Sequence, residues 1–345
     1  MHADARTSSR HPAASVRTGV RLRAMRAPLT VACLGECMIE LREQSPGVLV
    51  QGYAGDTYNV AVYLKRLDAR RALDVHYATA LGGDAFADDM LAAWATEGIG
   101  TALVRRVPER STGLYAIRTD ASGERHFSYW RDTSAARAYF DAAVTPLEER
   151  ADAIDLLVLS GITLAVMRAA LDVRLPALLD RVRAHGGRVA FDNNYRPRLW
   201  PDPDDARSAF AAVLARTDIA LLTLDDALEL EPSSDVERVL AQAFALPCAE
   251  VVVKRGTAST LVRRKDDARW MDVPVDAVKH PVDTTAAGDS FDAGYLMRRL
   301  SGGPPRDAAA FGNRVANVVV RHAGAIVPRA ALASLTDVGA GEATR

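Results

Sequence analysis

From Ile154 to Lys254 the chain alternates short apolar runs with longer stretches of helical pattern. The four runs are IDLLVLS at 154–160, RVAF at 188–191, IALL at 219–222 and VVVK at 251–254. Short runs rich in Val, Ile and Leu are typical of strands that are buried on both faces. Because helical stretches, notably 171–184 and 204–215, separate these runs, the pattern predicts a mainly parallel sheet with helices on both faces.

The alternation continues on both sides of this region. We expect Asp56 to cap a helix at 56–67 and Gly98 to end a helix at 84–97. Further strands are expected at 29–34 and 75–81, a hairpin-like pair at 259–264 and 269–273, and helices at about 288–300 and 306–322. The predicted fold class is therefore a doubly wound α/β sandwich.

Two regions, 36–52 and 102–131, do not follow the strand–helix alternation. They read as short hairpin strands, and the second region has a turn at 120–123. We predict that both regions form a small β-lid over one edge of the main sheet. One domain then covers 29–330, between a disordered N-terminal extension at 1–28 and a C-terminal tail at 331–345.

Composition and charge exclude several classes of protein. The 345 residues are 49% hydrophobic and 25% charged, which is ordinary for a globular chain. The net charge of −1 gives no electrostatic case for nucleic-acid binding, and the most apolar stretch, 153–167, contains Asp155 and is too short for a membrane span. Three cysteines are too few for a disulfide framework. We therefore expect a cytoplasmic protein with no nucleic-acid or membrane partner.

The segment VDTTAAGDSF at 282–291 is the strongest candidate for chemistry. Its small residues Ala286, Ala287 and Gly288 lead directly into a helix, whose first N–H groups lack helical partners and can bind an anion. The charge of Asp289 opposes phosphate binding, but it makes sense if Asp289 takes a proton from an attacking hydroxyl while the amides hold the phosphoryl charge. A structural interpretation also stays open, in which Thr285 or Asp289 only caps the helix.

This segment resembles the C-terminal motif of the PfkB (ribokinase-like) carbohydrate kinases, usually DTxGAGD. The resemblance implies that Asp289 is the catalytic base and that the Ala286–Gly288 amides form the anion hole. It covers 29–328, because YAGDTYNVA at 53–61, LGGDAF at 81–86 and VKRG at 253–256 also agree with the family in order and spacing. The implied sugar-binding residues here are Gly55, Asp56 and Asn59, and the implied nucleotide-binding residues are Asn194, Lys254, Gly256, Ala286, Gly288 and Asn317.

Two positions depart from the family motifs. Ala286 stands where the family usually has glycine, and alanine can offer its amide there only if the turn keeps φ negative. The family's Asn-x-x-Glu segment, which helps to place Mg²⁺ and its waters, maps onto Thr223-Leu-Asp-Asp226. Because Thr and Asp keep oxygen ligands but shorten the reach, we expect Asp226 to act on Mg²⁺ through water.

Two clusters with arginine indicate the substrate. YWR at 129–131 lies in the predicted lid, and NNYRPRLW at 193–200 follows a predicted core strand. Arg131 and Arg196 can each bind a carboxylate in a two-point grip, although a single surface arginine is more often solvated or weakly paired. Tyr115 adds a hydroxyl from the neighbouring lid strand.

The same clusters are similar to segments of the 2-keto-3-deoxygluconate kinases within this family. The similar segments are Tyr129-x-Arg131, NYRPRLW and GDTYN, while GECMIE at 35–40 and the TAAGD variant resemble the proteobacterial branch. In that subgroup these positions bind a six-carbon 3-deoxy keto acid. The resemblance therefore implies that ATP, with Mg²⁺, phosphorylates 2-keto-3-deoxy-D-gluconate at its 6-hydroxyl.

Two other functions stay open. One is a fructokinase or ribokinase that acts on a neutral sugar. The other is a sugar-sensing relative that has lost turnover, and the departures from the family motifs at Ala286 and Thr223 favour this alternative. For any of these, the strands of the predicted lid have exposed edges. Pairing two lids covers the edges, so we expect a homodimer.

Overall fold

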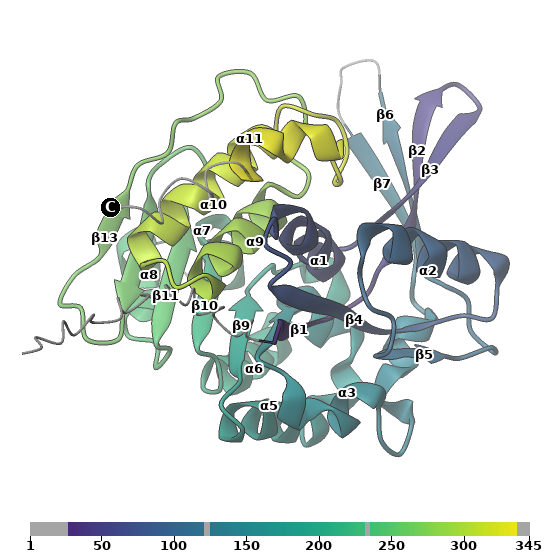
Figure 1. Cartoon of the computed structure of the whole chain (residues 1–345), viewed down its shortest axis with the longest axis horizontal. Helices are drawn as coiled ribbons and strands as arrows, with labels where there is room; N and C mark the ends of the chain where they lie inside the picture. Colours follow the sequence, from purple (N-terminus) through teal and green to yellow (C-terminus); the bar gives the residue numbers. More distant parts are fainter. Residues whose placement is uncertain (1–26, 121–124, 232–234, 337–345) are drawn as a thin grey trace, which may run out of the picture.

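The computed structural model describes residues 27–120, 125–231 and 235–336. A large sheet of nine strands forms its centre (Figure 1). In spatial order the strands are β13 (Met271–Val273), β12 (Thr260–Arg264), β11 (Glu250–Lys254), β10 (Ile219–Thr223), β9 (Arg188–Asp192), β8 (Leu156–Ser160), β1 (Leu29–Leu34), β4 (Leu73–Leu81) and β5 (Val104–Arg106). Neighbouring strands from β11 to β5 are parallel, while β12 is antiparallel to both β11 and β13. The predicted doubly wound sheet is confirmed.

Helices cover both faces of the large sheet. The longer ones are α1 (Asp56–Leu67), α2 (Ala85–Glu97), α5 (Arg174–Ala184), α6 (Pro203–Leu214), α8 (Val236–Phe244), α9 (Ala287–Leu300) and α10 (Pro305–Val319), and the shorter ones are α3 (Pro146–Glu149), α4 (Gly161–Val166), α7 (Leu224–Leu230) and α11 (Ala333–Thr336). No helix among the described ranges is long and apolar enough to cross a bilayer.

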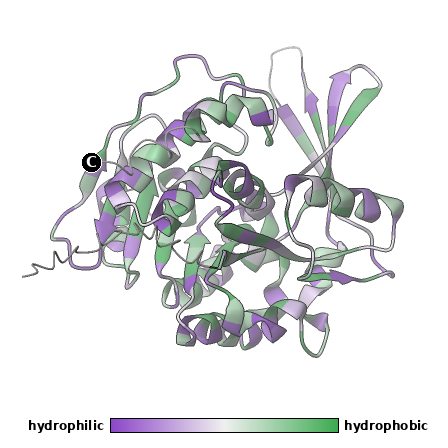
Figure 2. Cartoon of the chain, viewed as in Figure 1, coloured by the Kyte–Doolittle hydropathy of each residue, from purple (hydrophilic) through white to green (hydrophobic). Residues whose placement is uncertain are grey.

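The two layers arise because side chains alternate along each buried strand. In β1, Val31 and Cys33 pack with α1, α2, α9 and α10, whereas Ala32 and Leu34 pack with α4, α5 and α6. Figure 2 shows hydrophobic residues along the central strands and on the inner faces of helices, with hydrophilic residues outside. Such apolar runs are therefore buried on both sides, as the sequence predicts.

A second, small sheet projects from one end of the molecule (Figure 1). Its order is β3 (Val48–Ala54), β2 (Met38–Ser45), β6 (Leu114–Thr119) and β7 (Arg125–Trp130). These strands correspond to the predicted lid with one difference: Val104–Arg106, expected in the lid, forms β5 of the large sheet. It lies there because its backbone pairs with the edge of β4, which otherwise has unpaired N–H and C=O groups.

The two ends of the predicted domain fall partly outside the described residues. Positions 1–26 of the predicted extension and 337–345 of the predicted tail are not described. The part of the tail that is described is not extended, because it includes α11 and buries Leu332 against the core. The packed chain therefore continues a few residues beyond the predicted boundary at 330.

Candidate functional site

The start of α9 and the start of α1 meet at one end of the large sheet. Asn59 in the first turn of α1 donates its Nδ2 hydrogen bond to Oδ2 of Asp289, over 2.7 Å. The Oδ1 atom of Asn59 is buried and has no hydrogen-bond partner among the described residues. The structure thus brings together two predicted residues that are 230 positions apart in the sequence.

The first turn of α9 carries no side-chain cap. Its N-cap residue is Ala286, and neither Thr285 nor Asp289 caps the helix, which excludes the structural interpretation of these two side chains. Ala287 donates its N–H to the carbonyl of Thr284 over 3.2 Å. The N–H groups of Ala286 and Gly288 have no acceptor within the described ranges, so they are free to bind an anion.

The condition set for Ala286, a negative φ, is not met, and its N–H is nevertheless left without an acceptor among the described residues. The residue has φ 59° and ψ 17°, which is the left-handed conformation. This conformation costs an alanine roughly 1–2 kcal/mol, because Cβ approaches the following carbonyl, and glycine avoids the cost. The backbone is therefore shaped for the glycine of the family motif, although an alanine occupies it.

Asp56 does not cap α1 as predicted. Gly55 is the N-cap residue. Oδ1 of Asp56 accepts the N–H of the next residue, Thr57, over 2.8 Å, and Oδ2 accepts hydrogen bonds from Ser160 at the end of β8 and from Nδ2 of Asn194, the latter over 2.9 Å. Asn194, expected near the nucleotide, is thus held against a predicted sugar-binding residue. Gly55 allows a close approach, because a Cβ there would lie 2.1 Å from the carbonyl oxygen of Glu36.

Two buried carboxylates that the sequence analysis did not single out surround Lys254. Its Nζ lies 2.9 and 3.0 Å from the two oxygens of Asp292 and 3.2 Å from Oδ1 of Asp192. Burial alone would lower the pKa of Lys254, but the two negative charges outweigh it and raise the pKa. Lys254 therefore stays protonated. The sequence signal was an Asp at the end of the predicted strand at 188–191 and a second Asp one turn after Asp289.

The electrostatic surroundings of Asp289 favour its neutral form. Burial raises the pKa of Asp289 to about 7, and the charges of Asp56 and Asp192 add to the rise, while the Asn59 hydrogen bond and Lys254 oppose it. A carboxyl group with a pKa near 7 can both take and release a proton at neutral pH.

The small sheet contributes aromatic side chains. Tyr115 on β6 is buried and donates its hydroxyl hydrogen bond to Oε2 of Glu40 on β2. Its ring stacks with those of Phe127 and Tyr129 on β7, with ring centres 6.4 and 5.8 Å apart. Tyr129 is largely exposed. Burial and the Glu40 charge raise the pKa of Tyr115, so its hydroxyl remains a donor.

The predicted substrate arginine Arg131 is buried against Glu36. The two groups form an ion pair, yet both Glu36 oxygens and the Nε and Nη2 atoms of Arg131 have no hydrogen-bond partner among the described residues. Burial lowers the pKa of Arg137, and the charges of Arg131 and Arg168 lower it further against the opposing charge of Glu36. Arg137 is therefore influenced by two further guanidinium groups and by the carboxylates of Glu36 and Asp132, and of the three arginines the sequence analysis found only Arg131.

Burial alone would lower the pKa of Arg196, but the charges of Asp226, Asp192 and Asp56 raise it. Arg196 pairs with Asp226, the expected metal residue, over 3.1 Å. Burial raises the pKa of Asp226, and the charge of Arg196 opposes the rise. No three His, Cys, Asp or Glu side chains within 27–120, 125–231 and 235–336 gather closely enough to hold a metal ion. This donor set fits Mg²⁺ only in the predicted manner, with phosphates and water as the main ligands.

The remaining predicted nucleotide residues lie after β11, on α9 and on α10. Gly256 follows β11 with φ 60°, and Gly288 lies close to Lys254, whose Nζ would be 3.6 Å from a Cβ at that position. Asn317 on α10 donates to the carbonyl oxygen of Asp276 over 2.7 Å. In this structure Asn317 thus holds the segment before the VDTTAAGDSF motif.

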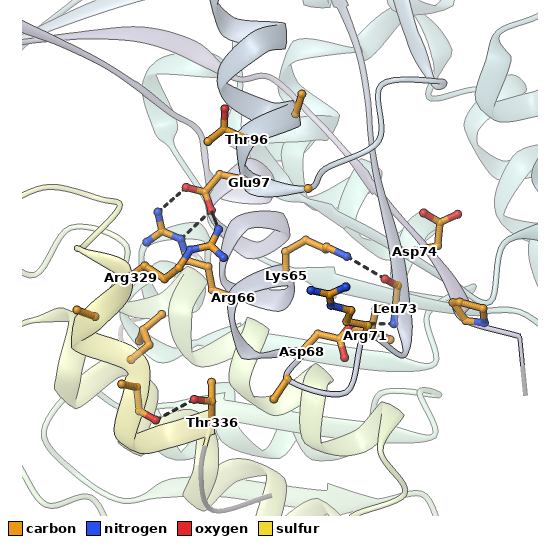
Figure 3. Close-up of a pocket in the computed structure, with 17 residues that line it drawn as sticks. Lys65, Arg66, Asp68, Arg71, Leu73, Asp74, Thr96, Glu97, Arg329 and Thr336 are labelled. Atoms are coloured by element: carbon orange, nitrogen blue, oxygen red, sulfur yellow. Dashed lines mark hydrogen bonds and ion pairs between the residues drawn. The ribbon is translucent and has the colours of Figure 1, made fainter. Parts of the chain in front are cut away.

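A cavity of about 940 Å³ lies at the opposite end of α1 (Figure 3). Its charged residues mainly bind one another: Arg66 and Arg329 both contact Glu97, and Lys65 donates to the carbonyl of Leu73. None of the predicted site residues lines it. We therefore place the candidate site at the start of α1 and α9, and not in this cavity.

Comparison with known proteins identifies the family to which the chain belongs. Residues 29–331 match the family described as pfkB family carbohydrate kinase. The chain is 46% identical to a 2-dehydro-3-deoxygluconokinase of Dickeya dadantii, over 88% of this chain and 98% of the relative. A PfkB protein from Polaromonas sp. JS666 has a similar structure, with a TM-score of 0.75, 27% identity and coverage of 89% of this chain and 100% of that one. A putative ribokinase II from Escherichia coli, solved with ATP and Mg²⁺, has a TM-score of 0.76 at 21% identity, over 91% of this chain and 100% of that one.

Proposed function

We propose that this chain, which belongs to the pfkB family of carbohydrate kinases and is itself a carbohydrate kinase, phosphorylates 2-keto-3-deoxy-D-gluconate at its 6-hydroxyl. The products are ADP and 2-keto-3-deoxy-6-phosphogluconate. The relative from Dickeya dadantii is named 2-dehydro-3-deoxygluconokinase, and this name supports the proposed substrate. Because the reaction consumes ATP, we expect it in the cytoplasm.

One observation carries the choice of an acidic sugar. Arg131 pairs with Glu36, and the charges of Arg131, Arg168, Glu36 and Asp132 all act on Arg137, so three guanidinium groups share this region with two carboxylates and leave an excess of one positive charge. Beside that ion pair, the buried Oε1 of Glu36 and Nε of Arg131 have no partner among the described residues, and they are suited to a ligand with both hydroxyl groups and a carboxylate, since buried polar groups normally have partners. A neutral sugar leaves that positive charge uncompensated. Gly55, Asp56, Asn59, Tyr115, Tyr129 and Arg196 complete the proposed sugar site.

Asp289 acts as the general base. It takes the proton of the 6-hydroxyl as O6 forms a bond to the γ-phosphorus and the bond between that phosphorus and the β,γ-bridging oxygen breaks. The hydrogen bond from Asn59 orients the carboxylate, and its pKa near 7 suits proton transfer at neutral pH.

The start of α9 supplies the anion hole. The N–H groups of Ala286 and Gly288 are available for the developing phosphoryl charge, and Ala287 joins them if its contact with Thr284 opens. Lys254, Gly256, Asn194 and Asn317 form the proposed ATP side. When bound, Mg²⁺ supplies neutralisation of phosphate charge, with Asp226 as its water-bridged carboxylate.

We also propose a homodimer in which two small sheets pair. The outer strands β3 and β7 are the edges of that sheet. Large apolar side chains are exposed at the sheet's edges, among them Val48, Leu49 and Trp130. Exposed edges and apolar patches of this kind are normally covered.

The direct test measures ADP release with Mg²⁺–ATP and four acceptors: 2-keto-3-deoxygluconate, gluconate, fructose and ribose. We expect turnover only on the keto acid, and a loss on the order of 10²- to 10⁴-fold in Asp289→Asn, because the base is removed. Asp225→Asn, an exposed neighbour of Asp226, is the charge-matched control and should keep its rate. In the wild type kcat/KM should fall below pH about 7, where Asp289 holds its proton.

The same panel separates the alternatives. Turnover on fructose or ribose, with Arg131→Ala unaffected, establishes a neutral-sugar kinase and removes the proposed role of the arginine cluster. Binding of the keto acid by calorimetry without ADP release identifies a sugar-sensing relative. An unchanged rate in Asp289→Asn contradicts the proposed base.

A further inference from the structure

An arginine on the edge strand of the small sheet reaches the segment that leads into the anion hole. Arg125, the first residue of β7, forms an ion pair through Nη1 with Oδ1 of Asp283. The same nitrogen lies 2.6 Å from the hydroxyl oxygen of Thr285. Asp283 and Thr285 directly precede Ala286, so this contact joins the small sheet to the backbone that presents the phosphate-binding amides.

Asp283 is also a junction for two further segments. Its Oδ1 accepts the N–H of Thr285 over 2.8 Å, and its Oδ2 accepts the N–H of Gly324, after α10, over 2.9 Å. Burial alone would raise the pKa of Asp283. The hydrogen bonds from the Thr285 side chain and from the N–H groups of Gly324 and Thr285 lower it, and the charge of Arg125 lowers it further. The carboxylate therefore stays ionised and joins β7, the 283–285 segment and the loop at 324.

An apolar contact lies beside this polar junction. Met38, Tyr115 and Ile117 of the small sheet pack with Ala325, and Phe127 and Ala286 pack against the same cluster. Non-directional apolar contacts allow sliding, whereas a guanidinium group held by a carboxylate and a hydroxyl has a defined geometry. Arg125 is thus the directional part of the contact between the small sheet and the anion-hole segment.

We propose that Arg125 is a positioning residue, which couples the placement of the small sheet over the sugar to the assembly of the anion hole through Asp283 and Thr285. The inference rests on the proposed kinase function for its catalytic consequence. When the sheet is seated, Arg125 holds the 283–285 segment in the conformation that turns the Ala286 N–H to the phosphate. When the sheet lifts, that constraint is released, and transfer of phosphate to water is suppressed.

The test is a double-mutant cycle of Arg125→Ala and Asp283→Asn, with Arg125→Lys as the conservative variant. We expect each single change to lower kcat on the order of 10- to 100-fold, the size of effect that a displaced catalytic group produces. Because both changes break one contact, the double variant should be little worse than either single variant. Arg125→Lys keeps the charge but cannot reach both oxygens equally well, so it should recover part of kcat.

Hydrogen exchange on the ligand-free protein gives a readout that does not depend on the substrate. Arg125→Ala should speed exchange in 282–290, and Asp283→Asn should speed it in 125–130. The matched control is Arg118→Ala, which removes an exposed ion pair with Glu43 inside the small sheet and should leave kcat and exchange in 282–290 unchanged.

Each outcome decides the proposal. Additive losses in the cycle, or unchanged exchange in the partner segment, overturn the coupling. A lower melting temperature with unchanged kcat shows a structural role only and also overturns it. If the wild type phosphorylates no sugar in the panel, the proposed function fails, while the exchange data still decide whether Arg125 joins the two segments.

Discussion

At Ala286 the backbone has a conformation that suits glycine, but the residue has a side chain. Its left-handed conformation lies at the sharp turn between the 282–285 segment and α9, where Ser290 donates its N–H to the carbonyl of Ala286 over 2.9 Å. A glycine avoids the strain but removes a methyl group that packs beside Tyr115 and Ala325. The contacts of the Ala286 methyl group therefore offset part of the free-energy cost of its strained backbone.

We expect Ala286→Gly to raise the free energy of unfolding by up to about 1 kcal/mol, because a strain of roughly 1–2 kcal/mol exceeds the ~0.8 kcal/mol of one buried methyl group. The matched control is Ala287→Gly at a helical position, which should lower the free energy by about 0.5–1 kcal/mol. Urea denaturation of both variants measures the difference. Equal losses in the two variants would show that Ala286 is not strained.

At the scale of elements, the segment LGGDAF at 81–86 bonds to the residues that lead into β6 of the small sheet. Asp84 is the N-cap of α2, where Oδ1 accepts the N–H of Ala87 over 2.9 Å, and its Oδ2 accepts the N–H of Thr112 over 3.1 Å. Gly82 lies so close to this connection that a Cβ would be 2.4 Å from the carbonyl oxygen of Arg110. The resemblance includes this segment among the family's motifs, and in the structure it joins α2 to the residues that lead into β6.

Asp84→Ala should therefore cost more than the loss of a cap. We expect a fall in the free energy of unfolding of about 2–3 kcal/mol, since the cap contributes ~1 kcal/mol and the unsatisfied Thr112 N–H adds ~1–2 kcal/mol. Asp202→Ala, the cap of α6 that bonds only Asp204 N–H, is the control and should cost about 1 kcal/mol. Chemical denaturation compares them, and similar losses would remove the role assigned to Thr112.

At the scale of the molecule, the small sheet protrudes while the rest of the chain is closed around the large sheet (Figure 1). The inner face of the small sheet packs on Ala286 and Ala325, but its edges expose Leu49 and Trp130, at 48% and 62% of their surface. An isolated chain leaves this apolar area and the strand edges in water. In the proposed homodimer, a second copy of the sheet would cover both.

We expect light scattering to give twice the mass of one chain at micromolar concentration. Leu49→Asp should shift the mass toward one chain, because a buried, unpaired charge is costly in the interface. Val173→Asp is the control at a more exposed valine far along the chain, and it should leave the mass unchanged. A single-chain mass in the wild type contradicts the dimer.

Short-range patterns carried most of the prediction of elements. The helix at 56–67 has the predicted bounds, and those of the core strands differ by at most two residues, because apolar runs and caps are local signals. Arg131 and Asp289 were found from motifs, and the structure pairs Arg131 with Glu36 and Asp289 with Asn59. The pairing of Val104–Arg106 with β4 was missed because three polar and apolar residues fit either sheet equally well.

The sequence by itself therefore determined the alternation of strands and helices, the family and the identity of the residues at the start of α9. Only the tertiary structure decided the partners of the charges: Glu36 for Arg131, Asp226 for Arg196, and Asp192 with Asp292 for Lys254. The physical reason is that strand and helix patterns arise within a few residues, whereas charge pairing and the pKa of Asp289 depend on burial and on distances between segments far apart in the chain.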